Sequence, residues 1–66
     1  MFKVGDKVLL FHQHEYTVVS MEEYATHRRP DPEARLFLKN KNGDYFWDES
    51  ETHYTLKRKV LFEESM

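Results

Sequence analysis

The stretch LFLKNKNGDYFW, which runs from Leu36 to Trp47, constrains the fold more than any other part of the chain. An Asn-Gly pair at 42–43, set between apolar runs, is the strongest short-range signal for a β-hairpin. Because successive side chains of a strand point to opposite faces, three consecutive aromatic residues cannot all face the same side. At least one of Tyr45, Phe46 and Trp47 is therefore expected to point away from the core.

The length of the turn decides which residues of the hairpin face each other, and two registers stay open. A two-residue turn, or a four-residue turn from Asn40 to Gly43, places on one face Leu36, Leu38, Tyr45 and Trp47. A three-residue loop with Gly43 in a bulge shifts the pairing by one residue and gives two pairs, Leu38 with Phe46 and Phe37 with Trp47. In either register an aromatic pair lies opposite the leucine face, where it forms a second small core or a ligand-facing patch.

A rival interpretation makes residues 31–41 a helix. Asp31 followed by Pro32 is a good helix start, and Gly43 would close a helix that runs through ARLFLKNK. Against the helix, leucines alternate with other residues at 36–39, and the segment runs directly into the Asn-Gly turn. The strand is therefore our prediction and the helix its alternative.

Two further strands are predicted before the hairpin and one after it. A bend at Gly5-Asp6 leads into a strand over residues 7–11, and the segment EYTVVSM at 15–21 is rich in residues that suit a pleated surface. The last strand is predicted over YTLKRKVLF at 54–62. The polar segment between Trp47 and this strand is expected to contain a short helical turn.

Residues 22–33 form the longest predicted loop, since they hold both prolines and many charges. A local helical turn is an alternative here, because Ser20 and Glu23 have capping-box spacing and Pro30 would end the turn. Tyr24 lies in this charged loop with no strand to bury it. It is therefore the aromatic residue most expected to be exposed.

The order strand, strand, long loop, hairpin, short turn, strand resembles the SH3-like small β-barrel, a broad family that includes KOW and Tudor-type modules. The resemblance rests on Val4-Gly5-Asp6-Lys7-Val8 at the first strand and on the hairpin from Leu36 to Trp47. It implies an all-β, five-stranded SH3-like barrel that forms a single domain over residues 1–66. It is a likeness of fold, which does not carry a function with it. In general appearance the chain is similar to the short stand-alone accessory proteins of bacteria and phages.

The chain has 66 residues, with five Phe, four Tyr, one Trp and no cysteine. A chain of this length buries only roughly 60% of its unfolded surface, so large aromatic side chains must supply the stability that disulfides cannot. The sequence contains neither an apolar run of membrane-spanning length nor the apolar core of a signal peptide. We therefore expect a soluble, cytoplasmic protein.

Catalytic and metal-binding patterns are weak in this chain. His12 and His14 would lie on one face of a strand, but no Cys or close Asp completes a metal-binding spacing. The sequence has no Gly-rich phosphate loop and no motif that links a nucleophile to a base. We expect no enzyme activity, no catalytic residue, no cofactor and no metal.

The aromatic residues and arginines instead predict a non-catalytic protein-interaction module, a small accessory or regulatory protein that binds a larger partner. Small β domains bind peptides in aromatic-lined grooves or by accepting a strand at an open edge, and arginines pair with carboxylates. The candidate binding residues are Tyr24, Arg28, Arg29, Phe37, Phe46, Trp47 and Tyr54.

Weak binding of nucleic acid is the alternative function. Basic side chains beside aromatic rings can hold phosphates while bases stack, although the formal net charge of -2 argues against a strong interaction. The candidate residues are Lys39, Lys41, Lys57, Arg58 and Lys59. An open strand edge or an exposed aromatic pair would also permit a homodimer.

Overall fold

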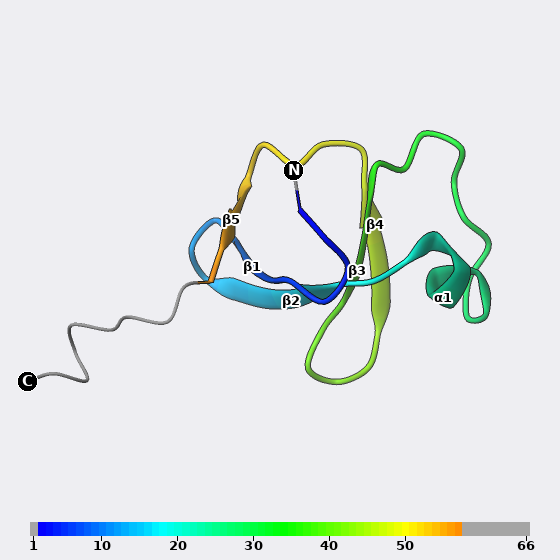
Figure 1. Ribbon diagram of the computed structural model, residues 1–66, viewed down its shortest axis with the longest axis horizontal. Helices are drawn as coiled ribbons and strands as arrows, with labels where there is room; N and C mark the ends of the chain where they lie inside the picture. Colours follow the sequence, from blue (N-terminus) through cyan, green and yellow to red (C-terminus); the bar gives the residue numbers. More distant parts are fainter. Residues whose placement is uncertain (1, 58–66) are drawn as a thin grey trace, which may run out of the picture.

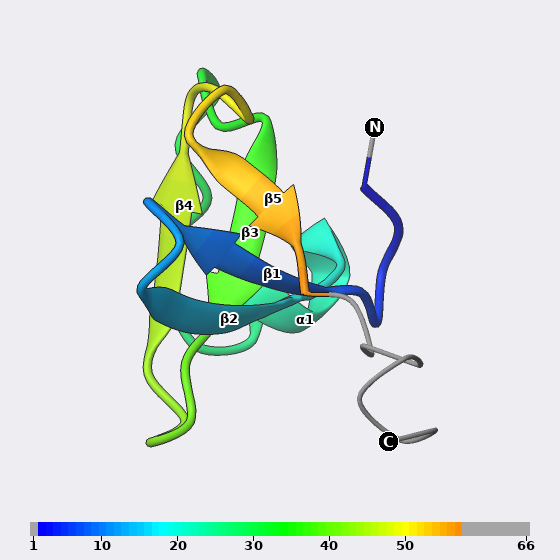
Figure 2. The same ribbon diagram turned by 90° about the vertical axis from the view of Figure 1, so that its left-hand side faces the viewer.

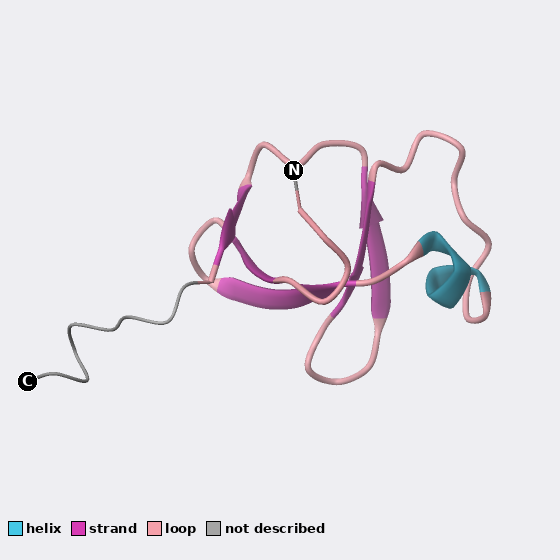
Figure 3. Cartoon of the chain, viewed as in Figure 1, coloured by secondary structure: helices cyan, strands magenta, loops and turns pink. Residues whose placement is uncertain are grey.

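A computed structural model of the chain describes residues 2–57, which fold into one antiparallel sheet and one short helix (Figures 1 and 3). The elements in chain order are β1 (Lys7–Leu10), β2 (His14–Val18), α1 (Met21–Ala25), β3 (Leu36–Lys39), β4 (Tyr45–Asp48) and β5 (Tyr54–Leu56). The strand order across the sheet is β4-β3-β2-β1-β5. The predicted all-β class is confirmed.

The sheet is curled but not closed. Figure 2 shows β1, β2 and β5 on the near side and β3 and β4 behind them. β4 and β5 are the two edge strands, and within residues 2–57 no strand pairing joins them. Instead, the Tyr54 hydroxyl on β5 donates a hydrogen bond of 2.8 Å to Asp48 Oδ2 on β4. A side-chain contact thus spans the gap that a closed barrel would fill with backbone hydrogen bonds.

The β3–β4 hairpin has the register of the three-residue loop. Leu38 pairs with Phe46 and Phe37 pairs with Trp47. The Asn40 N–H donates to the Asp44 carbonyl oxygen at 2.9 Å, and Gly43 follows the turn with a φ of +86°. A glycine tolerates this left-handed conformation at little cost, which is why the bulge forms there. The alternative helix over residues 31–41 is wrong.

α1 begins at Met21, the last residue of the strand predicted over 15–21, and continues into the predicted long loop, so β2 ends at Val18, three residues earlier than predicted. The helix begins as the capping-box spacing indicates. The Ser20 hydroxyl oxygen accepts a hydrogen bond of 3.0 Å from the Glu23 N–H, which would otherwise lack a partner at the start of a helix. The helix is five residues long and ends at Ala25, with Thr26 as its C-cap. The rest of the predicted loop, up to residue 33, has no regular secondary structure.

The helical turn predicted before the last strand is wrong, because residues 49–53 form bends and a single turn, which the Tyr54 N–H closes by donating to the Glu51 carbonyl oxygen at 3.1 Å. Side chains take the backbone donors that a helix would use: Asp48 Oδ1 accepts from the Ser50 N–H at 3.2 Å, and Ser50 Oγ accepts from the Thr52 N–H at 3.1 Å. Such local side-chain bonds compete with helix formation. The last strand begins at Tyr54 as predicted, and its predicted continuation over 58–62 lies outside the described residues.

The core has two parts, one on each face of the sheet. The inner face, which carries Leu36 and Leu38, packs a cluster of Val8, Val18, Leu36, Leu38 and Tyr54. The outer face, which carries Lys7, Thr17, Lys39 and Tyr45, packs a smaller cluster of Val19, Tyr24 and Tyr45, with Phe37 partly buried against it. The second small core expected opposite the leucine face is therefore present. It includes Phe37 but leaves Trp47 exposed.

Candidate binding surfaces

Two surfaces of the sheet combine exposure with a defined geometry. The first is the β4 edge, formed by the free side of β4 and the side chains of Phe46 and Trp47. Phe46 is 40% exposed and Trp47 is 38% exposed. Because neighbouring residues of a strand point to opposite faces, Phe46 lies on the inner face and Trp47 on the outer face. The β4 edge therefore has an exposed aromatic ring on each side of its backbone.

The backbone of the β4 edge offers free hydrogen-bonding groups. The Phe37 carbonyl oxygen accepts from the Val19 N–H at 2.9 Å, so at Phe37 the backbone of β3 points toward β2. Opposite residues of an antiparallel pair alternate between hydrogen-bonded and non-hydrogen-bonded pairs, so Phe37 and Trp47 form a non-hydrogen-bonded pair. The N–H and C=O groups of Trp47, and by the same alternation those of Tyr45, thus face away from the sheet.

The Phe46 ring is supported by two tyrosines on the inner face. It meets the ring of Tyr16 edge-on, with 5.6 Å between the ring centroids, and Tyr16 lies 6.4 Å from the ring of Tyr54. Burial, together with the hydrogen bond to Asp48, raises the pKa of the Tyr54 hydroxyl above its ordinary value. Tyr54 therefore stays a protonated donor, and its hydrogen bond keeps β4 and β5 connected.

On the outer face, Tyr45 is buried next to Trp47 and is held by the segment around α1. Its hydroxyl donates a hydrogen bond of 2.6 Å to Glu23 Oε2, and this bond raises the pKa of Tyr45. The His27 ring stacks on the Tyr45 ring with a centroid separation of 4.3 Å. These two contacts connect the start of β4 to α1 and the residues that follow it.

Two of the predicted surface residues are buried. Tyr24 is only 2% exposed, because α1 turns it onto the sheet where its ring lies 4.9 Å from that of Phe37. Tyr54 is 8% exposed in the inner core. The prediction that these two rings line a surface groove is therefore wrong. A sequence signal for Tyr24 existed in the Ser20 cap, since a capped helix turn gives an apolar residue a face to bury.

Arg28 and Arg29 are exposed just after α1. Within the part of the chain that the structure describes, neither guanidinium forms an ion pair or a side-chain hydrogen bond. Among residues 2–57, neither arginine forms a cation–π contact with Phe46 or Trp47. The structure therefore does not join the arginines to the exposed aromatic rings.

The second surface is the lysine row, which crosses the outer face of the sheet and consists of Lys57, Lys7, Thr17 and Lys39. Thr17 pairs with Lys7 on one side and with Lys39 on the other. Lys57 follows β5 and its N–H donates to the Lys7 carbonyl oxygen at 2.8 Å. Three of the row's four residues are lysines. The structure brings together Lys39 and Lys57 of the predicted basic set and adds Lys7 and Thr17, which the sequence reasoning missed because their pairing depends on strand order.

A carboxylate lies beside the lysine row rather than in it. Glu15 Oε1 is 2.7 Å from Lys57 Nζ and 3.5 Å from Lys41 Nζ. The hydrogen bond from Lys57 holds the pKa of the Glu15 carboxyl below its ordinary value. Lys7 and Lys39 form no ion pair with any other described residue: Lys7 Nζ lies 3.5 Å from Thr17 Oγ1, and Lys39 Nζ lies 5.5 Å from the centre of the Tyr45 ring.

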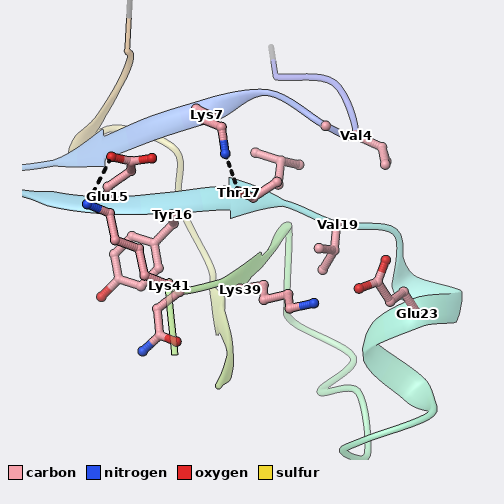
Figure 4. Close-up of a pocket in the computed structure, with 12 residues that line it drawn as sticks. Val4, Lys7, Glu15, Tyr16, Thr17, Val19, Glu23, Lys39 and Lys41 are labelled. Carbon is pink, nitrogen blue, oxygen red and sulfur yellow. Dashed lines mark hydrogen bonds and ion pairs between the residues drawn. The ribbon is translucent and has the colours of Figure 1, made fainter. Parts of the chain in front are cut away.

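A groove of about 390 Å³ runs over three residues of the lysine row, Lys7, Thr17 and Lys39 (Figure 4). Lys57 does not line this groove, whereas its partner Glu15 does. Figure 4 shows Lys7 reaching toward Thr17 while Lys39 extends toward the end of the groove that Glu23 borders. Val4 and Val19 add apolar side chains to its lining. The remaining predicted basic residues, Arg58 and Lys59, lie outside the described part of the chain.

No metal centre or membrane helix occurs in the described structure. Among residues 2–57, no three His, Cys, Asp or Glu side chains are grouped so that they could hold a metal ion. The single helix of this range is too short and too polar to cross a membrane. No family model, no curated protein sequence and no solved structure matches the chain. The two surfaces described above are therefore the basis for assigning a function.

Proposed function

We propose that this protein is a non-catalytic protein-interaction module that binds an extended segment of a larger partner at the β4 edge. The observation that carries the proposal is the free backbone of Tyr45 and Trp47, flanked by the exposed rings of Phe46 and Trp47. A partner strand added there would gain main-chain hydrogen bonds from the backbone and specificity from pockets for alternate side chains. The aromatic rings would supply contact area on both faces of the added strand.

A partner other than a second copy of the chain suits this edge. In antiparallel self-pairing that engages both outward residues, Tyr45 of one copy faces Trp47 of the other. The same register sets Asp44 of one copy opposite Asp48 of the other. Like charges directly opposite each other destabilise a strand pair, and charges of this kind protect natural edge strands from self-association. We therefore favour a different protein over the homodimer.

The same carboxylates indicate what the partner strand carries. Asp44, just before β4, alternates with Phe46 and Asp48 within it along the inner side of the β4 edge. Asp48 keeps its negative charge although its two oxygens accept hydrogen bonds from Tyr54 and Ser50. A complementary strand places an apolar residue opposite Phe46 and a Lys or Arg opposite each aspartate, since opposite charges across a strand pair are favourable. The partner segment is therefore proposed to read basic-x-apolar-x-basic.

We also propose that the curled sheet is an SH3-like small barrel with an open seam between β4 and β5. Two observations support this. Three successive antiparallel pairings run from β1 through β4, and β5 returns to pair with β1. The hydrogen bond from Tyr54 to Asp48 links the two edges across the seam.

A displayed library of short peptides tests the function. Peptides selected on the protein are expected to be enriched in the basic-x-apolar-x-basic pattern and to shift the emission of Trp47, the only tryptophan, to shorter wavelength. Phe46→Ala and Trp47→Ala should each weaken binding about tenfold or more, as expected for aromatic anchors that contribute over ~1.4 kcal/mol. Because the Trp47→Ala variant has no tryptophan, its peptide binding is measured by the fluorescence of a labelled peptide.

Phe11→Ala is the matched control, because Phe11 is 58% exposed but lies on the β1–β2 turn. It should leave peptide affinity unchanged. The proposal fails if the Phe46 and Trp47 variants bind the selected peptides with the same affinity as the parent protein. It also fails if the amide chemical-shift changes on binding lie outside residues 45–48.

A further inference from the structure

We propose that the lysine row is a binding track for the phosphodiester backbone of single-stranded nucleic acid. This site lies on the outer face and uses none of the backbone groups of the β4 edge, with which it shares only the Trp47 ring. The register of three strands and the end of a fourth places its residues side by side, so the row is a property of the fold.

The spacing of the row suits a linear polyanion. Lys57, Lys7, Thr17 and Lys39 come from four successive positions across β5, β1, β2 and β3. Neighbouring strands are about 4.8 Å apart, so the row extends roughly 14 Å across the sheet. A single bound anion would neutralise the positive charge of only part of the row. A chain of phosphates crossing the strands would meet each ammonium group in turn, and the Thr17 hydroxyl can donate a hydrogen bond between them.

The charge balance leaves the row with excess positive charge. Glu15 pairs with Lys57 and with Lys41, which stands at the border of the groove. Glu23, at the far end of the groove, already accepts the hydrogen bond from Tyr45 through one of its two oxygens. Lys7 and Lys39 flank Thr17 without a carboxylate between them. Two like charges repel, so an anion placed between them is favoured.

Aromatic rings continue the row onto β4. Lys39 pairs with Tyr45, and Trp47 is the next residue of β4 that points to the same face. A base of a bound strand can stack on the exposed Trp47 ring while its phosphates lie along the lysines, which is how many single-strand binders are built. The net charge of -2 over the whole chain means that binding should be weak and strongly dependent on salt.

The experiment measures the affinity of a labelled oligo(U) and a labelled oligo(dT) by fluorescence anisotropy over a series of salt concentrations. The logarithm of the association constant should fall with the logarithm of salt with a slope of about -2, because each of three phosphate contacts contributes about -0.7 for single strands. The double variant Lys7→Gln, Lys39→Gln should reduce the magnitude of this slope by about 1.4. Thermal unfolding of the variant checks that it remains folded.

Arg35→Gln is the control, because it removes one exposed positive charge that immediately precedes β3, four residues before Lys39. It should leave the slope unchanged, and the lysine variant should keep its affinity for peptides selected on the β4 edge. Competition with inorganic phosphate distinguishes a site for a chain of phosphates from a site for a single phosphate ion.

Three results would overturn the proposal. The first is the absence of oligonucleotide binding at low salt. The second is a loss of slope in the Arg35 variant of half or more of that in the double lysine variant, because an effect of net charge alone scales with the number of charges removed, one against two. The third is complete displacement by inorganic phosphate at the same concentration of phosphate groups, which would assign the row to a lone anion.

Discussion

At the scale of single residues, Gly43 determines the geometry of the β3–β4 hairpin. Its φ is +86°, and a Cβ atom built at this position would meet no atom within 4 Å. A residue with a side chain at position 43 would therefore be destabilised by the left-handed backbone conformation and not by a steric clash. The register of the aromatic residues of β4 depends on this one residue, because the bulge sets the pairing of Leu38 with Phe46.

Gly43→Ala should lower the free energy of unfolding by roughly 1 kcal/mol, since alanine has no favourable left-handed conformation. Gly43→Asn is the matched variant, because asparagine tolerates positive φ and should cost less. Urea denaturation of the three proteins checks this. Equal stabilities of all three would contradict the bulge.

At the scale of the elements, α1 is short but connects the outer core. It carries Tyr24, which is buried against Phe37 and Tyr45, and Glu23, which holds the Tyr45 hydroxyl. A five-residue helix has little stability of its own, so its cap and its packing must maintain it. Loss of the cap should therefore weaken the contacts that α1 makes with Tyr45 at the start of β4.

Ser20→Ala is expected to destabilise the protein by about 1 kcal/mol, because the Glu23 N–H loses its acceptor. Ser20→Asp keeps an acceptor at the cap and should stay near the parent. Chemical denaturation followed by tyrosine and tryptophan emission measures both. If the alanine and aspartate variants are equally stable, Ser20 does not act as a cap.

At the scale of the whole molecule, the hydrogen bond from Tyr54 to Asp48 links the two edges of the sheet and makes stability depend on pH. The pKa of Tyr54 in the folded protein is raised above the ordinary 10.0, mainly by burial. A raised folded pKa means that the stabilisation is complete below about pH 10 and is lost as the pH rises through the folded pKa. The raised pKa of Tyr45 acts in the same direction.

The free energy of unfolding should therefore fall above about pH 10, and Tyr54→Phe should make this fall shallower because the phenylalanine does not titrate. Urea denaturation between neutral and alkaline pH measures the slope. Tyr24→Phe serves as the control, since Tyr24 lies in the outer core and is not among the groups that raise the pKa of Tyr54. An identical alkaline slope in parent and Tyr54→Phe would contradict a role for this bond.

Several local features could be predicted from sequence because their causes are local. The Asn-Gly turn, the alternation at 36–39 and the Ser20 cap each depend on residues within a few positions of one another. The choice between the two hairpin registers was open, since both satisfy the alternation. The helical turn predicted before β5 failed because Asp48 and Ser50 bond their own neighbouring backbone, a competition that composition alone does not decide.

By itself, the sequence determined the all-β class, the approximate positions of the first four strands and the start of the fifth. It also showed that one face of the sheet cannot hold all the aromatic residues of the hairpin. Only the tertiary structure decided that Tyr24 is buried while Phe46 and Trp47 stay exposed, and that Lys7, Thr17 and Lys39 stand in one row. The physical reason is that burial and cross-strand neighbours depend on strand order and register. These bring together residues far apart in the chain, whereas turns and caps are set by neighbours in sequence.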